Sequence, residues 1–226
     1  MERPSQEAKT LDKEMASTQE PIEMKHALRV KQRFTSRLRA GGTLMILLWC
    51  FDARVAQAES HLGICEQQMA AVARTQAIPL GVLYAVAMTE TGRRGLLQPY
   101  ALNVEGKSIL AKSRAEAVDE FIRAKRSGAK LIDLGCMQVN HHYHGGEFRS
   151  VEDMLDPGMN VTYAARFLLR LREREGSWTM AIARYHAGPD NNPAQQRYIC
   201  AVIGNLVSTG FGNWTPAARA FCHRSN

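Results

Sequence analysis

The sequence predicts a mostly α-helical protein, with one folded domain that also holds a small β-hairpin. Apolar residues make up 45% of the 226 residues, which is enough for a substantial core. They recur at helical spacing in several segments between residues 62 and 207. One stretch, 97–111, instead combines Pro, Asn and Gly with short β-like pieces. We therefore expect a single α+β domain over residues 59–226.

Two helices are expected at the start of this domain. Residues 62–76 carry apolar side chains at helical spacing, at Leu62, Cys65, Met69 and Val72. The next helix has Pro79 in its first turn and ends at Gly92, positions that these residues favour. Its residues 80–90 are apolar nearly all round, which predicts a central, buried helix.

The middle of the domain alternates between extended and helical segments. We expect the hairpin in residues 97–111 to turn at Glu105-Gly106. Ser113 is expected to cap a helix that runs to about Arg126, with Glu116 completing a capping box. The segment "LIDLGCMQVN", residues 131–140, is expected to be extended and to lead into a turn.

Three further helices follow, at residues 160–175, 178–188 and 193–207. In the first, Val161, Ala165, Leu168 and Leu171 face inward, whereas arginines line the opposite face. In the last, apolar residues gather on one face, at Ile199, Val202, Ile203 and Leu206.

Residues 1–58 are expected to form a disordered leader followed by a secretory signal. Residues 1–23 are polar; a basic segment, a short apolar run and the A-x-A pattern at Ala56 and Ala58 follow. We place the cleavage after Ala58, and a start at Met24 would give the signal a normal length. A membrane anchor is the alternative, but it needs about 20 apolar residues. Lipid attachment at Cys50 is another, although Trp49 is a bulky neighbour.

Export would leave four cysteines in an oxidising compartment, where three complete pairings exist. We favour two disulfides, Cys65–Cys136 and Cys200–Cys222. The first would tie the opening helix to the segment around Gly135, and the second closes a short C-terminal loop. Four buried free thiols are the alternative. A zinc site is not expected, because the sequence contains no C-x-x-C.

The formal charge of +7 favours an anionic partner, but the domain itself is only mildly basic. No run of Lys and Arg is interleaved with aromatic residues, so nucleic acid is not an expected partner.

Glu90 is unusual among the acids because it ends the nearly all-apolar helix. An ionised carboxylate there is costly unless it is paired or opens onto a cleft. A protonated carboxylic acid in a cleft is what protonation of a glycosidic oxygen requires. The alternative is a surface acid whose helix emerges into water.

Two other segments carry polar groups suited to sugars. In "GCMQVN" a glycine turn precedes Gln138 and Asn140, whose amides both donate and accept, and Met137 offers an apolar wall for a sugar face. In "ARYHAG" the hydroxyl of Tyr185 is placed to donate to a carboxylate.

Together and in this order, four motifs resemble the soluble-type lytic transglycosylase domain, which is lysozyme-like and related to goose-type lysozyme. They are "TETG" at 89–92, "GCMQVN" at 135–140, "NVTYAARFL" at 160–168 and "AIARYHAG" at 181–188. The segment "PYALNVEGKS" at 99–108, which includes Asn103, resembles one branch of the family. The resemblance covers about residues 64–200 and implies cleavage of peptidoglycan between N-acetylmuramic acid and N-acetylglucosamine, leaving a 1,6-anhydro end.

The resemblance also implies roles for single residues. Glu90 corresponds to the single catalytic acid and base, and Tyr185 to the tyrosine that orients it. The sugar-contacting positions correspond to Thr91, Asn103, Met137, Gln138, Asn140 and His186. Thr91 replaces the usual Ser, His186 a commoner Asn, and Cys136 an apolar residue; Tyr163-Ala164 alters a Gly-containing motif.

A single acid is chemically sufficient for this reaction. Ordinary glycosidases use two carboxylates, and the nearest second candidate, Asp133, reads as a turn or cap residue. In a lytic transglycosylase the C6 hydroxyl of the muramic acid attacks C1. Glu90 would protonate the leaving oxygen and then accept the C6 proton.

Two further groups of polar residues, one of histidines and one of arginines, are interpreted as exposed surface and not as sites. The histidines of "HHYH" (His141, His142 and His144) would be exposed polar residues and not metal ligands. The arginines at 166, 170, 172 and 174 would form a solvated helix face, with contact to muropeptide or lipid phosphates as the alternative.

The sequence thus predicts an exported, periplasmic, monomeric lytic transglycosylase that needs no cofactor or metal. A hydrolytic muramidase on the same scaffold and an inactive wall-binding or assembly protein are the alternatives. Small single-domain members of the family often serve a flagellar or secretion machine, which would be a partner besides the glycan strands.

Overall fold

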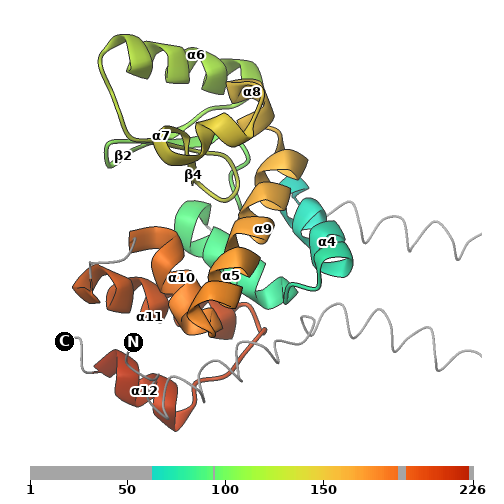
Figure 1. The fold of residues 1–226 in the computed structure, drawn as a ribbon, viewed down its shortest axis with the longest axis vertical. Coiled ribbons are helices and arrows are strands. Elements are labelled where there is room, and N and C mark those ends of the chain that lie inside the picture. Colours follow the sequence, from blue (N-terminus) through green and yellow to red (C-terminus); the bar gives the residue numbers. More distant parts are fainter. Residues whose placement is uncertain (1–62, 94, 188–191, 224–226) are drawn as a thin grey trace, which may run out of the picture.

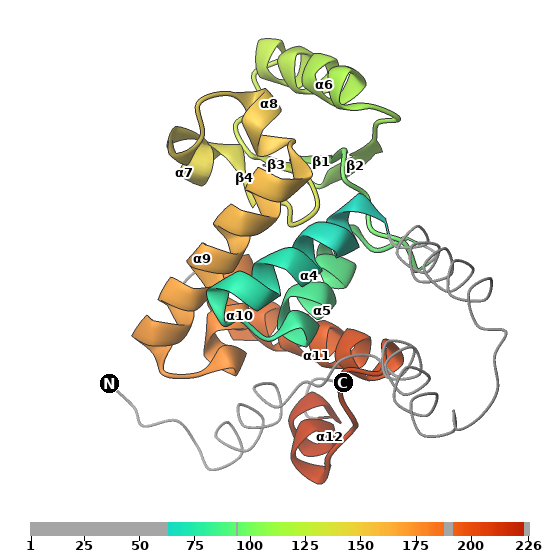
Figure 2. The ribbon, with the colours of Figure 1, turned by 90° about the vertical axis from the view of Figure 1, so that its right-hand side faces the viewer.

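The computed structural model describes residues 63–93, 95–187 and 192–223. The expected leader, the signal peptide and the cleavage after Ala58 lie outside these ranges. The described part is mostly helical with a small antiparallel sheet, as the sequence predicts. Its helices divide between one group at the end of the molecule that holds the sheet and a larger group at the other end (Figures 1 and 2).

The larger group contains most of the core. Its helices are α4 (Ile64–Gln76), α5 (Leu80–Thr91), α9 (Pro157–Glu175), α10 (Trp178–Ala187), α11 (Asn192–Ser208) and α12 (Pro216–His223). Helix α5 packs against α4 and α11, while α9 packs against α4 and α10. The apolar sequence of α5 is explained by this central place, since Val82, Leu83 and Val86 are fully buried. Pro79 is the cap residue before α5 and not its first helical residue.

The sheet has the order β2-β1-β3-β4, and all its neighbouring strands are antiparallel. Its strands are β1 (Ala101–Val104), β2 (Lys107–Leu110), β3 (Ile132–Leu134) and β4 (Val139–Asn140). The expected hairpin is confirmed: Glu105 and Gly106 both have positive φ, as a two-residue turn with right-handed strand twist requires. The sequence did not predict that residues 131–140 would add two more strands to this hairpin.

The remaining helices surround the sheet. They are α6 (Arg114–Arg126), α7 (His141–His144) and α8 (Val151–Met154). The Ser113 hydroxyl accepts the N–H of Glu116 at 3.2 Å, so the expected cap of α6 is confirmed. The Glu116 carboxylate in turn accepts the N–H of Lys112, one residue earlier than a standard capping box.

Helix α9 runs between the two groups (Figure 2). It begins three residues before the expected start, because Asp156 caps the N–H of Met159 at 3.0 Å and Pro157 occupies the first turn. Its expected inward face is confirmed by the burial of Val161, Ala165, Leu168 and Leu171. The earlier start places Asn160 inside the helix, where its side chain is fully buried.

Two disulfides, which are the favoured pairs, link these elements. Cys65–Cys136 joins α4 to the turn between β3 and β4, and Cys200–Cys222 joins α11 to α12. Helix α12, which the sequence did not predict, packs its Ala218 with Ala183, Ile199 and Ile203 in a small second core. In the part of the chain that the structure describes, no helix has the length and apolar character needed to cross a bilayer.

Candidate active site

A pocket of about 900 Å³ lies between the sheet and helices α9 and α10. Its walls come from the end of α5, from strands β1, β3 and β4, and from α7, α9, α10 and α11. Six of the eight expected site residues line it: Glu90, Asn103, Gln138, Asn140, Tyr185 and His186. Segments up to about a hundred residues apart in sequence therefore converge on one cavity.

Glu90 lies in the last turn of α5 with its side chain 15% exposed, so it is shielded but reachable from the pocket. The hydroxyl of Tyr198 donates to its Oε1 at 2.6 Å. His186 Nδ1 lies 3.7 Å from the same oxygen, and the His186 ring stacks on Tyr198 at 4.1 Å between centroids. The carboxyl group is therefore oriented from one side by a phenol and an imidazole.

The tyrosine that bonds Glu90 is Tyr198, and not Tyr185 as expected. The hydroxyl of Tyr185 donates instead to the carbonyl of Met137 at 2.7 Å. Burial, and next the charge of Glu90, raise the pKa of both tyrosines well above the ordinary value, so both remain protonated donors. Tyr198 had a signal in the sequence: it shares the buried face of α11 with Val202 and Leu206, where its hydroxyl needs a partner.

The turn between β3 and β4 is held on several sides. Gly135 has φ +79°, and a Cβ there would meet the amide of Asn160 at 2.6 Å, so the close approach requires glycine. Asn160 accepts the N–H of Met137 at 2.9 Å and donates to the carbonyls of Leu134 and Met154, both at 2.9 Å. This buried amide fixes the turn to the start of α9.

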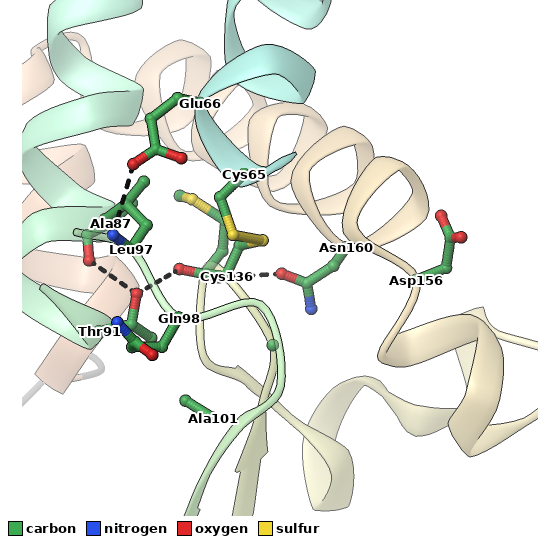
Figure 3. The surroundings of a disulfide bond; sticks show 12 residues. Cys65, Glu66, Ala87, Thr91, Leu97, Gln98, Ala101, Cys136, Asp156 and Asn160 are labelled. Carbon is green, nitrogen blue, oxygen red and sulfur yellow. Dashed lines mark hydrogen bonds between the residues drawn. A yellow bond between two sulfur atoms is a disulfide. The ribbon is translucent and has the colours of Figure 1, made fainter. Parts of the chain in front are cut away.

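The same turn is also fastened to α5 and α4. The hydroxyl of Thr91 bonds the carbonyl of Cys136 at 3.1 Å and that of Ala87 at 3.2 Å. Figure 3 shows Thr91 directed from α5 toward Cys136, beside the disulfide to Cys65. Because Thr91 follows Glu90 in the chain, this contact sets the position of the acid relative to the sheet.

Two expected sugar contacts are corrected by this geometry. Thr91 is 7% exposed and Met137 is fully buried, and neither lines the pocket. Met137 packs into the core because the turn directs it inward, so it offers no apolar wall. Both residues instead hold the turn, Thr91 through its hydroxyl and Met137 through its backbone.

The side-chain amides that line the pocket already use some of their atoms in hydrogen bonds within the protein. Gln138, with φ +46°, donates through Nε2 to the carbonyls of Ala101 and Gly135. Its Oε1 is the atom left to accept a hydrogen bond from a ligand. Asn103 accepts the N–H of Gly106 at 2.8 Å and so stabilises the hairpin turn.

Asp133, which the sequence interpretation considered as a second acid and set aside, lies on the pocket. It lies in β3 and lines the pocket with Glu90, so its interpretation as a turn or cap residue is wrong. Burial raises its pKa, the hydrogen bond from Asn140 lowers it, and the nearby charge of Glu90 raises it further. A two-residue strand such as β4 has no period, so no sequence signal placed Asp133 opposite Asn140.

The histidines of "HHYH" form helix α7. His144 lies on the pocket, where its Nδ1 is 2.9 Å from the hydroxyl of Tyr163, and its ring packs on Phe167. His141 instead packs on Phe121. Across residues 63–93, 95–187 and 192–223, no group of three or more His, Cys, Asp or Glu could hold a metal ion.

A helical domain with a small sheet, and between them a pocket that holds a shielded carboxylic acid, defines a lysozyme-like protein. The sequence matches the transglycosylase SLT domain family over residues 67–200, more than half of the chain, and the chain belongs to that family. Its general class is therefore that of lytic transglycosylases, which act on peptidoglycan. Comparisons with curated proteins and with solved structures give no match.

Proposed function

We propose that this protein is an exported peptidoglycan lytic transglycosylase in which Glu90 alone carries protons. Protonated Glu90 donates to the glycosidic oxygen between the two sugars, and the C1–O bond breaks. The C6 hydroxyl of the muramic acid then bonds to C1 and returns its proton to Glu90, leaving a 1,6-anhydro end. The observation that carries this proposal is the shielded Glu90 on the pocket, oriented by Tyr198.

The remaining pocket residues suit a glycan strand. Gln138 offers an acceptor for a sugar hydroxyl or N-acetyl N–H, and His186, 45% exposed, offers a ring nitrogen beside Glu90. Asn103 borders the same pocket from the hairpin. The proposed site of action is the periplasm, as a monomer on glycan strands, with a flagellar or secretion machine as the partner that the family resemblance implies.

One observation favours a second candidate, a hydrolytic muramidase. Asp133 and Glu90 share the pocket, and two carboxylates on one cavity are what glycosidases that use water require. The two activities differ in product, because hydrolysis leaves a reducing end and transglycosylation an anhydro end.

The test is mass spectrometry of purified sacculi digested with residues 59–226. Anhydro-muropeptides are expected, and Glu90→Gln is expected to lower their release by about 10²- to 10⁴-fold, the usual contribution of a general acid and base. Thermal unfolding followed by circular dichroism checks that the variant is folded. Reducing ends as the main product would favour the muramidase, and sedimentation with sacculi without any product would favour the inactive wall-binding protein.

A further inference from the structure

The proton transfer proposed for Glu90 does not use Asp133, yet Asp133 lies on the same pocket. It comes from β3, whereas Glu90 comes from the end of α5, so separate elements bring the two acids together. The charge of Glu90 contributes to the raised pKa of Asp133, after burial as the main cause. Two carboxylates in one partly buried cavity repel each other, and a neutral side chain would avoid that cost.

Asn140 fixes the orientation of Asp133. The Asn140 Oδ1 accepts the N–H groups of His142 at 2.9 Å and Tyr143 at 3.4 Å, and so caps α7. The opposite end of the amide must then face the sheet, where Nδ2 donates to Asp133 Oδ1 at 2.6 Å. An amide N–H only donates, so this contact favours the ionised form of Asp133.

Asp133 and Asn140 are also directly paired across the ladder between β3 and β4. Turning the Asp133 carboxyl group away would break its 2.6 Å hydrogen bond from Asn140, whose amide is itself held in place by the cap of α7. The structure thus presents a carboxyl group, held in one orientation by a donor that favours its ionised form, on the cavity wall contributed by the sheet.

We propose that Asp133 is a second catalytic carboxylate, which stabilises the positive charge that develops on C1 of the sugar as its bond to the leaving oxygen breaks. This inference rests on the proposed function, and it leaves the proton balance unchanged. Glu90 gives its proton to the leaving oxygen and receives one from the C6 hydroxyl, while Asp133 neither gains nor loses a proton. Its contribution is electrostatic and acts in a cavity shielded from bulk water.

The test compares Asp133→Asn with Glu105→Gln, kinetically, on soluble glycan strands. Both changes remove one negative charge from the same pocket, but Glu105 is exposed and its Oε1 accepts the N–H of Lys130, which an amide oxygen also does. Asp133→Asn is expected to lower kcat by about 100-fold with little change in KM, as for loss of a charge-stabilising group. Glu105→Gln is expected to lower kcat far less than Asp133→Asn does, because an exposed charge is screened by water.

The outcomes separate this inference from the proposed function. If wild-type protein releases no anhydro product, the proposed function fails and this inference with it. If the wild type is active and Asp133→Asn retains its kcat, only the inference is overturned. It is equally overturned if Asp133→Asn removes reducing-end products and spares anhydro products, because Asp133 would then activate water.

A second variant keeps the test independent of how Asp133→Asn folds. Asn140→Ser retains a cap oxygen for α7 but is too short to donate to Asp133. Without that donor the protonated form of Asp133 is favoured, so the acidic limb of kcat should move to higher pH. The other groups that act on Asp133, namely Glu90, His186 and Tyr185, are unchanged. An unmoved acidic limb would contradict the proposal, since a purely structural Asn140 would not shift it.

Discussion

At the scale of single residues, the site depends on which hydroxyl reaches the acid. Tyr198 is buried and Tyr185 half-buried, and both lie near Glu90, but Tyr198 donates to the acid whereas Tyr185 donates to the carbonyl of Met137. Because the two hydroxyls have different partners, removal of the hydroxyl by a Tyr→Phe substitution is expected to affect mainly the rate at Tyr198 and mainly the stability at Tyr185.

Tyr198→Phe is expected to lower the rate by roughly 10- to 100-fold, because Glu90 becomes charged as it gives up its proton and a hydrogen bond to a charged group contributes about 1.5–3 kcal/mol. Tyr185→Phe is the matched control. It leaves the Met137 carbonyl without its donor and is expected to lower the free energy of unfolding by about 1–3 kcal/mol, with a smaller loss of rate. Kinetics on glycan strands and urea unfolding of both variants measure this, and the reverse ranking of rates would contradict the assignment.

The sequence was informative for Glu90 and much less so for its neighbours. A lone acid at the end of an apolar helix stands out whatever the tertiary structure is, and the structure places Glu90 on the pocket. Whether Tyr185 or Tyr198 reaches it depends on how α11 packs against α5 and α10, which no local pattern contains. Asp133 was set aside as a turn or cap residue because an acid beside a glycine turn has the same local sequence in a cap as in a short strand.

At the scale of elements, the turn between β3 and β4 joins the sheet to three helices. Thr91 fastens it to α5, Asn160 to α9, and the disulfide of Cys136 to α4. The helices around it followed from apolar spacing and capping residues in the sequence. Strands β3 and β4, of three and two residues, are too short to show alternation; β3 is defined by its pairing with β1, and β4 by its pairing with β3.

Replacement of both Cys65 and Cys136 by Ser is expected to lower the free energy of unfolding by roughly 4 kcal/mol, since the disulfide closes a loop with a sequence separation of 71 residues. The double variant should also cleave glycan strands more slowly at temperatures where it is still folded, because the turn beside Thr91 loses its covalent link to α4. Calorimetry and glycan kinetics at a temperature where the variant is folded measure both effects.

The double replacement of Cys200 and Cys222 is the control for that change. Its sequence separation of 22 residues predicts a smaller loss of stability, roughly 3 kcal/mol, and the bridge lies between α11 and α12, away from the turn. Equal losses of rate in the two double variants would contradict a role of the first disulfide in holding the site.

At the scale of the whole molecule, titration of the buried groups couples stability to pH. Burial, and further the charge of Arg170, lower the pKa of His144 below its usual 6.5, against an opposing effect of Glu147. The unfolded chain then binds the proton more readily, so this contribution to stability is present above about pH 6.5 and is lost as the pH falls. The raised pKa of Asp133 acts in the opposite direction, because its protonated form is favoured in the folded state.

Acidification from about pH 7.5 to about pH 5 is therefore expected to destabilise the wild type more than His144→Gln, which does not titrate. Asp133 and His141 are present in both proteins, so their effects cancel in the comparison. Urea unfolding at each pH measures it. Parallel pH dependences of the two proteins would show that His144 does not contribute.

The disulfide between Cys65 and Cys136 predicts where in the cell the enzyme becomes fully assembled. A reducing compartment such as the cytosol keeps thiols reduced, so a chain that folds there would lack the disulfide that holds the turn between β3 and β4 beside the pocket. If the protein is exported as proposed, the Cys65–Cys136 bond would form only after the chain has crossed the inner membrane, and the active site would be completed there. The cell would then acquire a fully assembled wall-cleaving enzyme only in the compartment where the wall is found.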